Sequence, residues 1–178
     1  GARFNMERIR THWSKTRNAE EAQRQIDCIV LACSHMSASK TGALIIITKN
    51  QGLNEYADTG EIVDAAISVQ MIENIFFKNT PLHDGAMIIS SGRIYAAACI
   101  LPVSKRQDLP KSYGLRHRAA LGLAEKTDAI AIVVSEETGK ISVAQGNTIK
   151  TVSTNELEHT YLAPAYGVEY KKDNNKTK

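Results

Sequence analysis

Residues 85–101 read GAMIISSGRIYAAACIL, two apolar runs separated by a short polar turn. Serine and glycine are turn formers, and glycine readily adopts the positive φ that a tight hairpin needs. The pattern predicts a strand over residues 85–90, a hairpin turn at Ser91-Gly92 and a return strand over residues 93–101. Because a hairpin joins antiparallel strands, this stretch argues against a wholly parallel sheet.

Helices and further strands are predicted on both sides of this hairpin. Apolar residues recur at three- and four-residue steps from Asn18 onward, which predicts a helix that Gly42 ends. The other expected elements are, in chain order, a strand over 43–48, a helix capped by Ser68 and stopped by Pro81, a polar loop over 102–110, a helix over 115–126, strands over 129–135 and 140–144, and a short helix capped by Ser153. The most apolar strands lack polar alternation, so we expect them to be central. The expected fold is α/β, with a mixed, mostly antiparallel central sheet and helices packed on both faces.

The composition is that of one ordinary folded domain. The chain has 178 residues, of which 43% are hydrophobic and 23% charged, enough for a single core. Its longest apolar runs, such as residues 129–134, fall far short of the roughly 20 residues that span a bilayer. No secretory signal peptide opens the chain, and its three cysteines cannot all pair, which favours a reducing compartment. We therefore expect the chain alone to be soluble.

The excess positive charge lies near the end of the chain. The net charge is +3, and the last eight residues contain four lysines and one aspartate. The remainder is neutral and lacks the clustered basic residues that bind nucleic acid, so we expect no nucleic-acid partner. We divide the chain into a basic leader over 1–17, a folded domain over 18–165 and a flexible basic tail over 166–178.

A histidine and an aspartate, His83 and Asp84, directly precede the first strand of the hairpin. An imidazole beside a carboxylate can hold a divalent metal or move a proton. Gly85, the next residue, lets the backbone approach a ligand closely. The alternative is an aspartate that closes a loop beside an incidental histidine.

Two more polar clusters follow at the ends of predicted elements. Residues 114–118, GLRHR, open a helix, where the helix dipole disfavours cations, so Arg116 and Arg118 suggest binding of an anionic group such as phosphate. The alternative is surface arginines paired with nearby acids. Residues 135–137, Ser-Glu-Glu, end a buried strand, and their carboxylates suit Mg²⁺ or Mn²⁺ unless they only form a polar hairpin. The glycine motifs of P-loop and Rossmann nucleotide enzymes are absent from the sequence.

Two triplets about thirty residues apart, Asp84-Gly85-Ala86 and Arg116-His117-Arg118, resemble the signature motifs of bacterial diadenylate cyclases. Residues 42–45 and 135–139 match further stretches of that family in the same order. The resemblance runs from about Arg24 to Ala144, and it is closest to the catalytic domain of the membrane-anchored class.

The resemblance implies a reaction in which two ATP molecules give cyclic di-AMP and two pyrophosphates, with Mg²⁺ or Mn²⁺ as the metal. Each subunit binds one ATP, and two subunits face each other as a homodimer. Two other functions stay open: a non-catalytic sensor module that binds an adenine nucleotide, and a scaffold for assembly at the membrane. The scaffold leaves the three polar clusters without a role.

The resemblance also implies a role for each residue of these motifs. The catalytic residues are Asp84, Arg116, His117 and Arg118, of which the last three contact phosphate. The ATP-binding positions are Gly85, Ala86, Leu101, Gly114, Leu115 and Ser135, with the Leu101 backbone reading the adenine edge. The metal ligands are His83, Asp84, Glu136 and Glu137. Many relatives have threonine in place of Leu115, so this chain lacks one hydroxyl donor to phosphate.

The basic leader suggests a location for the protein. Five arginines and lysines within residues 1–17, with few acids, fit a cytoplasmic stretch that follows a membrane helix. The alternative is a solvated basic end. We expect the full-length protein to be anchored in the cell membrane through an N-terminal segment absent here, with this domain in the cytoplasm. Whether a regulatory protein binds it stays open.

Overall fold

The computed structural model describes the backbone of residues 2–170 and the side chains of residues 18–170. Gly1, residues 171–178 of the predicted tail and the side chains of the predicted leader lie outside the described residues. The helices are α1 (Ala2–Ser39), α2 (Asn54–Ala57), α3 (Val69–Phe76), α4 (Leu115–Lys126), α5 (Thr154–Glu156), the π-helix η1 (Leu157–Leu162) and α6 (Ala163–Ala165). The strands are β1 (Ala43–Ile47), β2 (Glu61–Ala66), β3 (Ala86–Ser90), β4 (Arg93–Cys99), β5 (Ile130–Val134), β6 (Ile141–Gln145) and β7 (Thr148–Val152).

These strands form one sheet in the order β2-β4-β3-β1-β5-β6-β7. β1 and β3 are parallel, and the other neighbouring pairs are antiparallel. The mixed, mostly antiparallel sheet is therefore confirmed, and the β3–β4 hairpin turns at Ser91 and Gly92, both with positive φ. The apolar strands β3, β1 and β5 take the central places, and every residue of β1 and β5 is buried.

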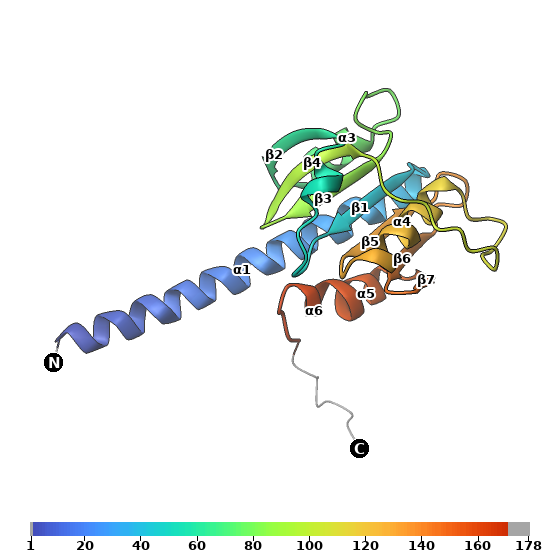
Figure 1. The fold of residues 1–178 in the computed structure, drawn as a ribbon. Coiled ribbons are helices and arrows are strands. Elements are labelled where there is room, and N and C mark those ends of the chain that lie inside the picture. The colour runs from blue at the N-terminus through green and yellow to red at the C-terminus, as the bar shows by residue number, and fades with distance from the viewer. Residues whose placement is uncertain (1, 171–178) are drawn as a thin grey trace, which may run out of the picture.

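Helices pack on both faces of the sheet (Figure 1), which confirms the expected layers. Side chains alternate between the two faces of a strand. In β1, Ile45 and Ile47 join the core formed with α1, α3 and η1, whereas Leu44 and Ile46 join the core formed with α4. Figure 1 also shows that α1 runs along one face of the sheet and continues beyond it toward the N-terminus.

The helix starts and the sheet edges differ from the sequence-based expectations. α1 begins at Ala2, well before the predicted start at Asn18. The strands β2 and β7 were not predicted, because both are edge strands with mostly exposed or half-exposed side chains and no apolar run. In β2 the register also shifts beside Asp64, whose φ is +46°. The predicted cap on α3 is confirmed, since the Ser68 hydroxyl accepts the Met71 N–H.

The strand directions bring four chain segments to one end of the sheet. The parallel strands β1 and β3 begin at this end, and their antiparallel neighbours β5 and β4 finish there. The register shows it directly, because Ala43 pairs with Val134 and Ala86 pairs with Cys99. The loops before β1 and β3 and after β4 and β5 therefore meet.

Candidate functional site

All three polar clusters of the sequence lie at this end of the sheet. The His83-Asp84 pair precedes β3, and the Ser-Glu-Glu run of 135–137 follows β5. Arg116, in the first turn of α4, has its guanidinium against Gly42, the residue before β1. Segments far apart in the sequence thus form one candidate site.

Gly85 lets the segment before β3 lie directly against the end of β4. Its φ is +111°, and a β carbon here would be 2.8 Å from the Ala98 carbonyl carbon and the Cys99 oxygen. β4 bulges at this place, since the register with β3 shifts and Ala98 has a φ of +53°. No other residue type adopts this conformation without strain. The packing leaves Asp84 exposed and buries Ala86.

His83 and Asp84 offer two metal-ligating atoms side by side. The His83 Nδ1 lies 2.6 Å from the Thr80 carbonyl oxygen. A carbonyl only accepts, so Nδ1 donates this hydrogen bond and Nε2 is the ring nitrogen left for a metal. Within residues 18–170, the Asp84 carboxylate has no hydrogen-bond or ion-pair partner. Both groups are chemically suited to a divalent cation.

The described residues do not by themselves build a complete metal site. Among the described residues, no three His, Cys, Asp or Glu side chains come close enough to hold a metal ion together. The four predicted ligands therefore do not form a closed cage. Mg²⁺ commonly takes only one or two carboxylates and fills its remaining positions with water and substrate phosphate oxygens. The residues present fit that kind of site, in which the nucleotide supplies part of the coordination.

Arg116 is fixed between two of the predicted segments. Its Nη1 lies 3.5 Å from the Glu136 carboxylate, and its side chain is only 24% exposed. A β carbon on Gly42 would lie 2.5 Å from the same Nη1, so the guanidinium occupies the space that a side chain at 42 would need. The positive charge of Arg116 is therefore fixed in position beside the starts of β1 and α4.

His117 is buried and supports the start of α4. Its ring stacks on Tyr113 with 4.3 Å between centroids, and its Nδ1 accepts the Gly114 N–H at 3.1 Å. Burial, helped by the nearby charge of Arg116, lowers the pKa of His117. The imidazole is therefore neutral, with its proton on Nε2. Its predicted contact with phosphate stays a prediction, and the structure gives it a second task as the cap of the helix.

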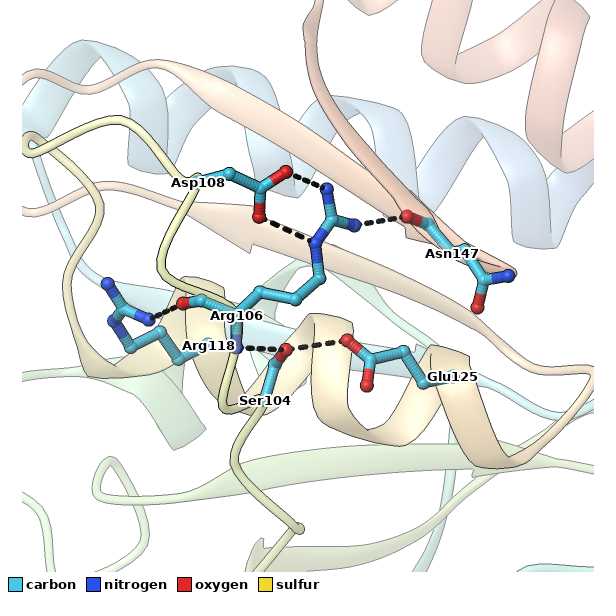
Figure 2. A network of polar contacts seen from close by, with 6 residues as sticks. All are labelled: Ser104, Arg106, Asp108, Arg118, Glu125 and Asn147. Carbon is cyan, nitrogen blue, oxygen red and sulfur yellow. Dashed lines mark hydrogen bonds and ion pairs between the residues drawn. The ribbon is translucent and has the colours of Figure 1, made fainter.

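Arg118 faces a different part of the molecule from Arg116. Residues two apart on a helix are rotated by about 200°, so the two arginines point to different sides. The Arg118 Nη1 donates to the Arg106 carbonyl oxygen at 2.8 Å (Figure 2). The sequence alone assigned both arginines to phosphate. In the structure, one N–H of Arg118 is used to hold the loop after β4.

Ser135 organises the turn that carries Glu136 and Glu137. The buried Ser135 hydroxyl accepts the backbone N–H groups of Glu137 and Thr138, each at 3.2 Å. Both carboxylates are exposed, and Glu136 reaches Arg116. A direct contact of Ser135 with ATP stays a prediction.

The end of β4 is held by Thr59, which belongs to none of the site motifs in the sequence. The N–H of Ile100, the residue before Leu101, donates to the Thr59 hydroxyl at 2.8 Å. Leu101 is buried, whereas Leu115 is 72% exposed at the start of α4. The partners Thr59 and Ile100 are 41 positions apart, and no local pattern links them.

Three carboxylates of the candidate site, those of Asp84, Glu136 and Glu137, are exposed to solvent. A hollow of about 430 Å³ lies at the opposite end of β1 and β3, where Lys49, Ser91 and Tyr166 line it, and it contains none of the predicted site residues. At the start of β3, Asp84 is exposed and His83 is half-buried. Such a surface is suited to being covered by a second molecule.

The model of the family described as DisA bacterial checkpoint controller nucleotide-binding matches residues 30–149. Cyclic di-AMP synthase CdaA of Bacillus subtilis is 42% identical over 159 residues, which cover 89% of this chain and 57% of that relative. A diadenylate cyclase of Listeria monocytogenes is 44% identical over 158 residues, which cover 88% and 58%. The chain thus spans less than two thirds of the length of these relatives.

Solved structures agree with the sequence matches. A double mutant of DacA from Staphylococcus aureus matches with a TM-score of 0.80 at 40% identity, over 83% of this chain and 99% of that one. A hypothetical membrane spanning protein from Bacillus cereus matches with a TM-score of 0.69 at 42% identity, over 71% and 62%. Within the described residues, no helix combines the length and the apolar character that a membrane crossing requires.

Proposed function

The chain belongs to the DisA bacterial checkpoint controller nucleotide-binding family, and from that premise we propose that it is a diadenylate cyclase domain. It condenses two ATP molecules into cyclic di-AMP and releases two pyrophosphates. The observation that carries the proposal is the meeting of Asp84, Gly85 and Arg116 at one end of the sheet. Relatives more than 40% identical are named as enzymes of this activity.

The proposed chemistry needs positioning and charge neutralisation more than covalent catalysis. Asp84 faces solvent and is available to accept the proton of the attacking ribose hydroxyl. Arg116, which fills the space beside Gly42 and pairs with Glu136, neutralises charge on the phosphates. Gly85 lets this segment pack against the end of β4 and leaves Asp84 at the surface. We infer that the backbone of Gly85 and Ala86 lines the nucleotide.

We infer that a divalent cation, Mg²⁺ or Mn²⁺, binds together with ATP. The His83 Nε2 and the Asp84 carboxylate would hold it, with Glu136 and Glu137 nearby as further carboxylates. When bound, the cation supplies neutralisation of the phosphate oxygens. Because no three side chains of the described part gather as a cage, metal affinity is expected to depend on the nucleotide.

Two copies of the chain are needed for one product molecule. Cyclic di-AMP contains two nucleotides, and the chain carries one copy of each motif. We infer a face-to-face homodimer in which each 3′-hydroxyl attacks the α-phosphate held by the partner. The exposure of Asp84, Glu136 and Glu137 supports this arrangement, because a second copy can reach these side chains.

We infer that the whole protein is anchored in the cell membrane, with this domain in the cytoplasm. The support is the similarity to a protein described as membrane spanning and the partial coverage of the longer relatives. The exposed Leu115, where many relatives have threonine, favours one second candidate, a sensor that binds adenine nucleotide without reaction.

The test is product analysis by mass after incubation of the chain with ATP and Mn²⁺ or Mg²⁺. We expect cyclic di-AMP from the wild type and a loss of at least about a hundredfold in Asp84→Asn, the range typical of lost acid–base assistance. Asp27→Asn, on the exposed surface of α1, is the matched control and should leave the rate unchanged. ATP binding without product in the wild type would support the sensor, and full activity in Asp84→Asn would remove Asp84 from the mechanism.

A further inference from the structure

The loop between β4 and α4 joins two parts of the candidate site. Residues 100–114 contain no helix or strand, which is a long irregular stretch for a compact domain. Leu101 stands at its beginning and Gly114 at its end. Both are predicted nucleotide contacts, so the contacts that hold this loop act between two predicted parts of the site.

The first half of the loop is fastened to α4. The Ser104 N–H donates to the Arg118 carbonyl at 2.9 Å, and the Arg118 guanidinium returns a bond to the Arg106 carbonyl at 2.8 Å. The Ser104 hydroxyl donates to the Glu125 carboxylate (Figure 2). Gly122 permits this close approach, because a β carbon there would lie 2.0 Å from the Pro102 carbonyl oxygen.

The middle of the loop is fastened by the side chain of Arg106. Its Nε and Nη2 donate to the two oxygens of Asp108 at 2.9 and 2.8 Å. Its Nη1 donates to the carbonyl of Asn147, in the turn between β6 and β7 (Figure 2). One guanidinium thus closes the loop on itself and ties it to a separate hairpin. A planar guanidinium with five fixed donors is suited to such a three-way contact.

We propose that Arg106 is a positioning residue: it does not touch the nucleotide, but it holds the loop whose two ends are predicted to bind the nucleotide. The contacts of the Arg106 guanidinium with Asp108 and Asn147 are called the clamp below. The clamp keeps the Arg106 carbonyl where it accepts the hydrogen bond from Arg118, so the loop stays packed on α4. The adenine end and the phosphate end of the site then keep their separation before ATP arrives. The nucleotide part of this inference rests on the proposed function, whereas the clamp itself does not.

Loss of the clamp should raise KM for ATP more than it lowers kcat. Both ends of the loop are predicted to contact ground-state ATP, and removal of such contacts raises KM while kcat stays nearly constant. We expect Arg106→Ala and Asp108→Ala each to raise KM for ATP about tenfold and to change kcat less than about threefold. A general loss of folding would instead lower the active fraction and reduce kcat.

Limited trypsin digestion measures how often the loop opens, and it needs no nucleotide. Lys111 is exposed within the loop and is present in every variant, so cleavage after it reports the opening of this segment. We expect faster cleavage at Lys111 in Arg106→Ala and in Asp108→Ala. Arg93→Ala is the matched control, because Arg93 forms the same kind of exposed pair with Asp64 on the edge of the sheet. It should change neither KM nor cleavage.

The proposal is overturned if cleavage at Lys111 and KM stay at wild-type values in both loop variants, or if Arg93→Ala changes them equally. Faster cleavage with unchanged KM also overturns it, because the loop would then be held without consequence for ATP. A wild-type chain that makes no cyclic di-AMP contradicts the proposed function alone. In that case cleavage and ATP affinity by calorimetry still decide the role of Arg106.

Discussion

The guanidinium of Arg116 lies over Gly42, in the space where a side chain at that position would stand. A β carbon on Gly42 would be 2.5 Å from Nη1 and 2.6 Å from the guanidinium carbon of Arg116. The two residues come from the start of α4 and from the loop before β1, and Glu136 holds the same guanidinium from a third segment. Because position 42 is a glycine, the guanidinium of Arg116 can lie at the end of the site that is predicted to bind phosphate.

Gly42→Ala should displace Arg116 without removing it. The φ of Gly42 lies outside the left-handed region, so alanine fits the backbone, and the overlap falls on the flexible end of a side chain. We expect ATP affinity to fall about tenfold, roughly 1.4 kcal/mol, with little change in the unfolding midpoint. Calorimetry with ATP and with adenosine measures it, since only the phosphates depend on Arg116. Gly52→Ala is the control, because nothing lies within 4 Å of its added β carbon. Equal ATP affinity in wild type and Gly42→Ala would contradict the assignment.

Gly85→Ala should destabilise the fold as well as the site. The new β carbon meets the backbone of β4, which cannot rotate away, and the φ of +111° is strained for alanine. We expect a loss of about 2–5 kcal/mol in the free energy of unfolding, measured in urea. Gly146→Ala, with a φ of +60° and open space around it, separates backbone strain from overlap and should lose only about 1 kcal/mol. Similar losses in both variants would show that contact with β4 is unimportant.

The lowered pKa of His117 predicts that the free energy of unfolding depends on pH. Its pKa in the folded chain is lowered from the ordinary value of 6.5 by burial and by Arg116. As pH falls through 6.5, the unfolded chain binds the proton first, so the free energy of unfolding decreases. The difference in unfolding free energy between wild type and His117→Gln should therefore shrink from about pH 8 to about pH 5. A difference that stays constant or grows on acidification would mean that His117 is protonated in the folded chain.

Apolar runs made the centre of the fold predictable. β1, β3 and β5 are buried strands without polar alternation, and the Ser91-Gly92 turn fixes the hairpin. The edge strands were not predictable in the same way. β2 carries Asp64 at a positive φ, and β7 is mostly exposed, so neither shows the apolar pattern that marks a central strand.

The site could be predicted as a set of residues but not as a set of contacts. Motif order and position at a strand end and a helix start were enough to select Asp84 and Arg116. Arg116 lies against Gly42, whereas Arg118 donates to the Arg106 carbonyl. These contacts depend on the orientation of α4 relative to loops that are distant in sequence. Thr59 was not selected at all, because its bond to Ile100 joins positions 41 apart. Such non-local contacts leave no periodic signal in one sequence.

The central claim, that two copies of this chain join two ATP molecules, is tested most directly by the rate of cyclic di-AMP formation per chain across a wide dilution series, with the mass of the protein followed by light scattering. Each chain carries one Asp84 and one Arg116, so a lone copy has no second nucleotide to attack. We expect the rate per chain to rise with protein concentration and to level off as dimers saturate. A constant rate per chain in a sample that stays monomeric throughout would contradict the account and would require a second nucleotide site within one chain.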